Sequence, residues 1–68
     1  MNQDPEAGQV WRHRNGNRYC VIAIANASGS PERQAKYPVT VVYQNVSNRT
    51  IWARRLDDWH RSMTREPA

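Results

Sequence analysis

The chain has 68 residues, a formal net charge of +4, one cysteine and no phenylalanine. A chain of this length allows one small domain, which buries about 60% of the surface that its unfolded form exposes, so an enzyme cleft is not expected. One cysteine cannot form an internal disulfide, and no apolar run approaches the ~18 residues that a membrane span needs. With no signal segment visible, we expect a cytoplasmic protein that is not an enzyme.

The first predicted elements are two strands joined by a tight turn. Residues 1–8 are polar, lack apolar periodicity and are expected to be disordered. Residues 9–14 and 17–26 are rich in apolar residues of strand type and are predicted as strands. Asn15 and Gly16 between them are the strongest hairpin signal of the chain, because both tolerate the positive φ angles of a type I′ turn.

The next segment, residues 27–38, is predicted as a loop. It contains glycine and proline residues that interrupt regular structure, among them Pro31. It also carries Arg33 and Lys36 beside Tyr37, a combination of basic and aromatic side chains. A loop of this length is either a functional segment or a solvated connector, and the sequence leaves both open.

The second half of the chain predicts a hairpin followed by a short helix. Residues 39–45 and 50–55 are rich in β-branched and aromatic residues and are predicted as strands. Apolar residues spaced i, i+3, i+4 and i+7 then predict a helix over residues 56–63, with a disordered tail over residues 64–68. The residues with this spacing are Leu56, Trp59, His60 and Met63.

Together these elements predict one domain over residues 9–63, of the mostly β class. Four to five antiparallel strands and a short C-terminal helix are expected. The second strand is apolar on both of its faces, which favours a strand covered on both sides, as in a small closed barrel. The predicted core consists of Val21, Ile22, Ile24, Val41, Tyr43, Ile51, Trp52, Leu56 and Trp59.

An ordered set of residues carries a resemblance to a known family. The set is Trp11-Arg12-His13, Gly16-Asn17, Tyr19, Val41-Val42-Tyr43-Gln44, Trp52, Arg54, Leu56 and Trp59. Over about residues 8–59 the chain resembles the bacterial and phage domain-of-unknown-function family 1653, although Arg55 stands where that family usually has a proline. The resemblance implies a small SH3-like β-barrel of bacterial or phage origin and brings no established activity.

The residues that could carry chemistry are not arranged as a site. His13, Cys20 and His60 show neither Cys-x-x-Cys nor paired-histidine spacing, and a structural zinc ion needs four close ligands. No Gly-rich phosphate loop is present. We therefore expect no cofactor, no metal site and no catalytic residue.

Two binding functions remain for a small basic domain. The first is a protein-interaction adaptor or regulator, since small barrels bind partners through grooves lined by aromatic residues and loops. The alternative is a nucleic-acid-associated module in which arginines contact phosphates and aromatic rings stack on bases. We expect a monomer that binds a protein partner, with nucleic acid as the alternative and no membrane. The candidate binding residues are Trp11, Arg12, Arg14, Arg18, Tyr37, Arg54 and Arg55.

Nine of the ten cationic side chains are arginines, and their arrangement decides what they recognise. Residues two apart in a strand share a face, so Arg12 and Arg14 lie on the same side. If the first and last strands approach each other, Arg54 joins them in one positive patch. The alternative is that the arginines are scattered and paired with nearby carboxylates. Those carboxylates are Asp57, Asp58 and Glu66.

Overall fold

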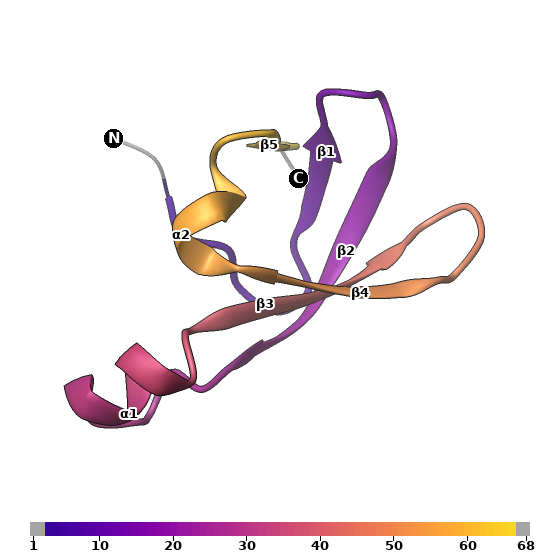
Figure 1. The fold of residues 1–68 in the computed structure, drawn as a ribbon. Coiled ribbons are helices and arrows are strands. Elements are labelled where there is room, and N and C mark those ends of the chain that lie inside the picture. The colour runs from indigo at the N-terminus through magenta and orange to yellow at the C-terminus, as the bar shows by residue number, and fades with distance from the viewer. Residues whose placement is uncertain (1–2, 67–68) are drawn as a thin grey trace.

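The computed structural model describes residues 3–66, which form one antiparallel sheet with two short helices (Figure 1). The strands are β1 (Val10–His13), β2 (Arg18–Ala25), β3 (Thr40–Asn45), β4 (Ile51–Arg55) and β5 (Met63–Arg65), and the helices are α1 (Pro31–Lys36) and α2 (Leu56–Trp59). The predicted mostly β class, with its antiparallel strands and short helix near the C-terminus, is confirmed. Residues 1–2 and 67–68, in the predicted disordered termini, lie outside the described residues.

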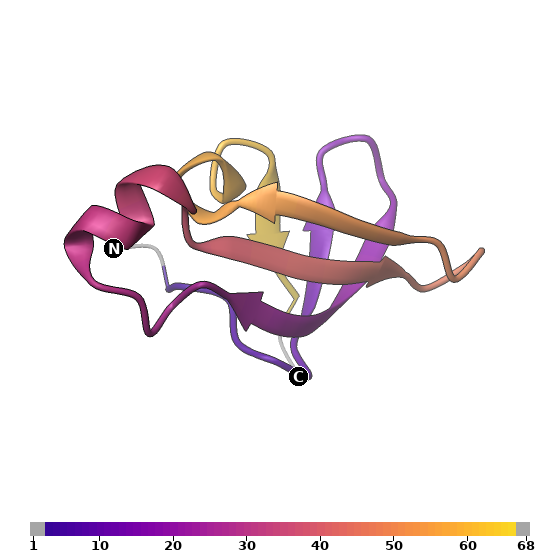
Figure 2. The ribbon, with the colours of Figure 1, turned by 60° about the horizontal axis from the view of Figure 1, so that its bottom comes forward.

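The strand order β4-β3-β2-β1-β5 makes β4 and β5 the two edges of the sheet. The predicted barrel is therefore open, because no ladder joins β4 to β5 within residues 3–66. The sheet is nevertheless strongly curved, and the β1–β2 hairpin runs across the direction of the β3–β4 hairpin (Figures 1 and 2). A bulge in β2, where the register shifts between Val21 and Ala23, adds to this bend.

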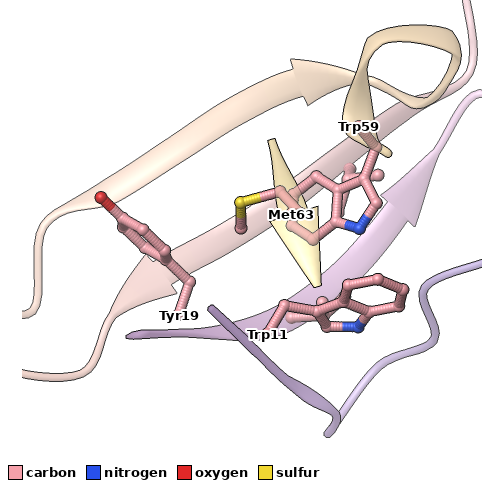
Figure 3. Close-up of a cluster of buried hydrophobic side chains, with 6 residues drawn as sticks. Trp11, Tyr19, Trp59 and Met63 are labelled. Atoms are coloured by element: carbon pink, nitrogen blue, oxygen red, sulfur yellow. The ribbon is translucent and has the colours of Figure 1, made fainter. Parts of the chain in front are cut away.

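The concave face of the sheet holds the core, which α2 covers. The rings of Trp11 and Trp59 meet edge to face, with centroids 5.6 Å apart (Figure 3). The Nε1 of Trp59 is buried and has no hydrogen-bond partner among the described residues. The buried apolar residues are Trp11, Tyr19, Val21, Val41, Trp59 and Met63.

Three residues of the predicted core are on the surface. Ile22, Ile51 and Trp52 are 42%, 63% and 54% exposed. Ile22 lies at the bulge of β2, whereas Ile51 and Trp52 lie on β4, an edge strand of the described sheet. The prediction was wrong here because a strand's composition does not reveal whether the strand is central or at an edge. The other six are buried or partly buried against the core, namely Val21, Ile24, Val41, Tyr43, Leu56 and Trp59.

The β1–β2 turn is in the predicted place but has a different geometry. The N–H of Gly16 donates to the carbonyl of His13, and the N–H of His13 donates to the carbonyl of Asn17, both at 2.8 Å. Gly16 has a φ of 96°, while Asn15 is not in the positive-φ region. The connection is therefore a type I turn followed by a glycine in the left-handed region, and the predicted type I′ turn is wrong.

Replacing Gly16 by valine is expected to lower the free energy of unfolding by about 1–2 kcal/mol. A Cβ at this position would meet no atom within 4 Å, so the cost arises from the backbone conformation alone. Gly16→Asn serves as the control, because asparagine enters the left-handed region more readily and its cost is smaller. Urea denaturation measures both variants, and a valine variant as stable as the asparagine variant would contradict the turn geometry.

Helix α1 lies inside the segment that the sequence predicts as a loop. Ser30 caps it, since its Oγ accepts a hydrogen bond from the N–H of Arg33 at 3.3 Å. Pro31 occupies the first helical position and Glu32 lies in the first turn, both favourable at a helix start. The Ser-Pro-Glu signal was thus present in the sequence, but the prediction gave more weight to the glycine and prolines around it.

The C-terminal part also differs from the prediction. The helix predicted over residues 56–63 ends at Trp59, and Met63 begins strand β5. Thr64 and Arg65, placed in a disordered tail by the sequence, pair with β1. The burial of Met63 fits a helix face and a strand face equally well, so its spacing from Trp59 did not discriminate between them.

The described part of the N-terminal segment is anchored to the sheet. Pro5 is buried, and the N–H of Gly8 donates to the carbonyl of Val21 at 2.9 Å. The N–H of Gln9 donates to the carbonyl of Glu6 at 3.2 Å, which closes a turn that contains Gly8 at a φ of 90°. The prediction of disorder is therefore wrong for residues 3–8. None of the helices within residues 3–66 has the length and apolar character needed to cross a membrane.

Candidate functional site

Two of the candidate arginines share one carboxylate on the outer side of the sheet. Arg12 in β1 and Arg18 in β2 are cross-strand partners. Arg12 Nη2 lies 3.8 Å from Glu66 Oε1, and Arg18 Nε lies 2.5 Å from Glu66 Oε2. Glu66 follows β5, so the C-terminal segment brings a negative charge to this pair. The local charge available for an anionic partner is correspondingly reduced.

The remaining candidate arginines do not join them. Arg54 is the cross-strand partner of the buried Val41 and so lies on the concave side. Arg12 follows the buried Trp11 in β1 and lies on the opposite side. Arg14, in the β1–β2 turn, is exposed. The predicted single patch of Arg12, Arg14 and Arg54 is therefore wrong. The three are scattered, and Arg12 and Arg54 are paired with carboxylates as the alternative predicted, whereas Arg14 has no ion pair within residues 3–66.

The carboxylates of α2 pair with the arginines at the end of β4. Arg54 Nε lies 3.0 Å from Asp58 Oδ2, and Arg55 Nη2 lies 2.5 Å from Asp57 Oδ2. Arg61 adds a second contact to Asp58 at 3.2 Å. Hydrogen bonds from Arg54 first, and from Arg61 second, hold the pKa of Asp58 below its ordinary value. These contacts join β4 to α2 and to the turn that follows it.

Replacing Asp58 by asparagine is expected to remove a stabilisation that depends on pH. Because the folded pKa of Asp58 lies below the unfolded one, the stabilisation is present above the unfolded value and is lost as the pH falls through the folded one. The difference in Tm between the wild type and Asp58→Asn should therefore narrow on acidification below about pH 4.

Glu32→Gln is the matched control, because Glu32 has no ion pair among the residues the structure describes. Its Tm difference from the wild type should not narrow in the same way. Thermal unfolding followed by circular dichroism at a series of pH values checks both variants. A constant difference for Asp58→Asn would contradict the proposed role of the two arginines.

The two aromatic candidates have different environments. Trp11 is 2% exposed, and its Nε1 donates to Gln9 Oε1 at 3.1 Å, so it belongs to the core and offers no binding surface. Tyr37 is exposed just after α1, with the Arg33 guanidinium carbon 5.9 Å from its ring centroid. Both side chains line an open hollow of about 590 Å³ beside α1, which also contains Ser28.

The titratable residues considered for metal binding or catalysis are dispersed. His13 lies in β1, Cys20 in β2 and His60 after α2. Between residues 3 and 66, no group of three His, Cys, Asp or Glu side chains is placed to hold a metal ion. His60 Nε2 lies 3.5 Å from Asp4 Oδ1 but makes no hydrogen bond with the described residues.

Alternate residues of β4 form the backbone hydrogen bonds to β3. At one end of the ladder, the N–H of Asn45 donates to the carbonyl of Thr50 at 2.9 Å. At the other end, the N–H of Leu56 donates to the carbonyl of Val39 at 2.9 Å. The register between these bonds is regular, and the bonding residues of an antiparallel ladder alternate. The even-numbered residues of β4 therefore direct their backbone groups toward β3.

The odd-numbered residues of β4 direct their backbone groups toward the open edge. These residues are Ile51, Ala53 and Arg55, and within residues 3–66 no second strand pairs with β4. The edge is also apolar, because Ile51, Trp52 and Ala53 are all exposed. A row of unpaired N–H and C=O groups beside apolar side chains is a template for pairing with another strand.

The ring of Trp52 is held in place although it is exposed. Its Nε1 donates to Thr50 Oγ1 at 2.8 Å, and Thr50 Oγ1 donates to Asn48 Oδ1 at 2.6 Å. Its cross-strand partner Tyr43 packs against the core, where burial raises the pKa of the tyrosine hydroxyl above its ordinary value. Trp52 thus extends the aromatic side of the hairpin beyond the core in a fixed orientation.

The outer face of the sheet continues the apolar surface away from the edge. Val42 is the cross-strand partner of Ala53 on one side and of Ala23 on the other. Ala23 and Ala53 are exposed, and Ile22 lies at the neighbouring bulge. These strands were predicted from the sequence, but Ile22, Ile51 and Trp52 were predicted to lie in the core. The site was missed because strand order was needed to find it.

One comparison with known proteins gives a match. The model of a family described as a protein of unknown function (DUF1653) matches residues 9–67. No curated protein and no solved structure matches the chain. The matched residues contain all the strands of the sheet and both helices.

Proposed function

The chain belongs to the DUF1653 family of proteins of unknown function, and we propose that it is a non-enzymatic protein-interaction module that binds an extended partner segment along β4. The observation that carries this proposal is the combination at one edge of unpaired backbone groups and exposed large apolar side chains. Ile51 and Trp52 supply the apolar area, on opposite faces of the same strand.

The proposed binding mode is strand addition. A partner strand pairs with the outward backbone groups of Ile51, Ala53 and Arg55, and each hydrogen bond contributes about 0.5–1.5 kcal/mol net. Its side chains alternate between the two faces, so one set contacts Trp52 and the other contacts Ile51. β4 contains no proline and no lysine, residues that block such pairing, and its one inward-pointing charge, Arg54, lies near the end of the strand and is paired with Asp58.

Nucleic-acid binding has less support from the geometry. Arg12, Arg18, Arg54 and Arg55 already contact carboxylates, which compete with phosphate. The exposed Tyr37 lies beside α1, at the opposite end of the molecule from the tip of the β3–β4 hairpin (Figure 1). A salt titration separates the two functions, because phosphate contacts give a linear fall of log K with log salt concentration.

We place the protein in the cytoplasm of a bacterium or a bacterium infected by a phage. The bacterial or phage origin comes from the family resemblance. Cys20 is a half-buried free thiol, which suits a reducing compartment.

The experiment that tests the function compares two surface variants. Ile51→Lys places a charge on the β4 edge, whereas Val46→Lys places the same charge on an equally apolar exposed residue of the β3–β4 turn. We expect Ile51→Lys to abolish capture of partner proteins from a bacterial lysate and Val46→Lys to retain it. A captured partner is then purified, and amide hydrogen exchange should show new protection at Ile51, Ala53 and Arg55. A partner that binds both variants equally, or that protects other amides, would overturn the proposal.

A further inference from the structure

Arg49 occupies a backbone position that favours a different residue type. It ends the β3–β4 turn with a φ of 62°, in the left-handed region that glycine and asparagine enter most readily. The turn holds this conformation, because the N–H of Arg49 donates to the carbonyl of Asn45 and Gln44 Nε2 donates to the carbonyl of Arg49, both at 2.9 Å. Both bonds use backbone atoms of residue 49, so a glycine would form them without the steric cost. The fold therefore gives no reason for an arginine at this position.

The positive charge of Arg49 is not used within residues 3–66. Arg49 is exposed and forms no ion pair there. The nearest acidic residues along the chain are those of α2, and both of their carboxylates already pair with arginines. A second copy of the chain would therefore bring no unpaired carboxylate from α2 to this position. The charge is available to a carboxylate from another protein.

Arg49 lies at one end of the open edge of β4. Ile51, the first residue that directs its backbone groups outward, follows two residues later, so the Cα atoms of the two are at most about 7 Å apart. The same turn orients the ring of Trp52, whose Nε1 donates to Thr50 Oγ1. The turn forms the tip of the β3–β4 hairpin, on the side of the molecule away from both helices (Figure 1). A fixed turn thus places one positive charge beside the apolar part of the edge.

A segment that pairs with β4 reaches Arg49 with one of its ends. Antiparallel pairing is slightly more stable per residue than parallel pairing, so we expect the segment to run from Arg55 toward Ile51. The C-terminal end of the segment then lies beside the turn. A carboxylate at this end accepts charge-assisted hydrogen bonds from the guanidinium, which can bind both of its oxygens.

We propose that Arg49 selects the partner of β4 by binding an Asp or Glu side chain that follows the apolar residues of the partner segment. The inference rests on the proposed function, because it adds a chemical class of partner to the same edge. The observation that carries it is an arginine without an ion pair within residues 3–66, in a left-handed turn position. Binding accounts for an arginine where the fold alone favours glycine.

Stability and binding should respond differently to Arg49→Gly. Without a Cβ, residue 49 adopts its φ of 62° at a lower cost, so the Tm should equal the wild-type value or exceed it by a few degrees. Binding of acidic segments should weaken, because the guanidinium is lost. Thermal unfolding followed by circular dichroism measures the first effect, and the peptides described below measure the second. A clear fall in Tm would contradict the unfavourable conformation, and unchanged binding would overturn the inference.

The partner chemistry is tested with a displayed library of random peptides, selected in parallel on the wild type and on Arg49→Gln. Peptides selected on the wild type should be enriched in Asp and Glu after an apolar stretch, and those selected on the variant should not. Ile51→Lys should bind neither set. Arg33→Gln is the matched control, because Arg33 is an exposed arginine of α1 without an ion pair within residues 3–66. Peptides selected on Arg33→Gln should be as acidic as those selected on the wild type.

A double-mutant cycle then measures the contact itself. One peptide selected on the wild type is synthesised with an amidated C-terminus, so that its side chains supply the carboxylates, and a second version carries glutamine in place of the acidic residue. Fluorescence anisotropy should show that removing either charge weakens binding about two- to fivefold, the range of an exposed ion pair, and that removing both causes little further loss. The effect should shrink at high salt concentration.

The outcomes separate this inference from the proposed function. Peptides that need Ile51 but bind the wild type and Arg49→Gln equally would overturn the inference and leave strand addition in place. A library without any peptide that depends on Ile51 would overturn both. Self-association of the wild type that Ile51→Lys abolishes would place a second copy on the edge, and a single-stranded oligonucleotide whose binding depends on Arg49 would assign its charge to phosphate. Either result would overturn the inference.

Discussion

Replacing Trp59 by alanine is expected to lower the free energy of unfolding by about 3–5 kcal/mol. Trp59 is 0% exposed, and its ring meets those of Trp11 and Tyr43 edge to face at centroid distances of 5.6 Å and 5.0 Å. Small domains have a total stability of about 5–15 kcal/mol, so this change removes a large share. Urea denaturation followed by circular dichroism measures it.

The matched control is Trp52→Ala, which removes the same side chain from the edge strand. Its ring is 54% exposed and lies outside the core cluster, so we expect a loss of less than about 1 kcal/mol. Equal losses in the two variants would contradict the division of the tryptophans between the core and the open edge.

Trp52 and Trp59 show which part of the burial pattern could be predicted from the sequence. Both Trp52 and Trp59 lie in apolar segments and were predicted to be buried, and only Trp59 is. The difference arises from the strand order, in which β4 is an edge and α2 covers the concave face. That order depends on β5, a strand of three residues, Met63–Arg65, with too short a pattern to recognise. Local periodicity therefore located the first four strands but not the edge of the sheet.

The ion pairs of the arginines also differ in whether the sequence could predict them. The pairs of Arg54 with Asp58 and of Arg55 with Asp57 are close in sequence, and both carboxylates were predicted from the sequence as possible partners of the arginines. The pair of Arg18 with Glu66 joins residues 48 positions apart and depends on how the C-terminal segment returns to β1. Of the candidate binding residues, only Arg55 directs its backbone N–H and C=O groups toward the open edge of β4. Arg55 was predicted as a binding residue because of its charge and not because of this position.

The direction of the β4 backbone groups predicts opposite effects for two neighbouring prolines. Trp52→Pro removes an N–H directed at β3 and leaves the carbonyl of Tyr43 without its partner, which should cost about 2–4 kcal/mol. Ala53→Pro removes an N–H directed at solvent, a position where edge strands accept proline, and should cost about 1 kcal/mol or less. Urea denaturation of the two variants measures both costs.

Trp52→Ala separates the loss of the side chain from the loss of the hydrogen bond, because it removes the ring of Trp52 and keeps the N–H. Ala53→Pro should nevertheless prevent partner capture, since the missing N–H lies at the centre of the edge. A stable Ala53→Pro variant that still protects the neighbouring amides on binding would mean that partners dock on the side chains of Ile51 and Trp52 without strand addition. A strongly destabilised Ala53→Pro beside a stable Trp52→Pro would instead reverse the assignment of the two directions, and would contradict the open edge on which the proposed function depends.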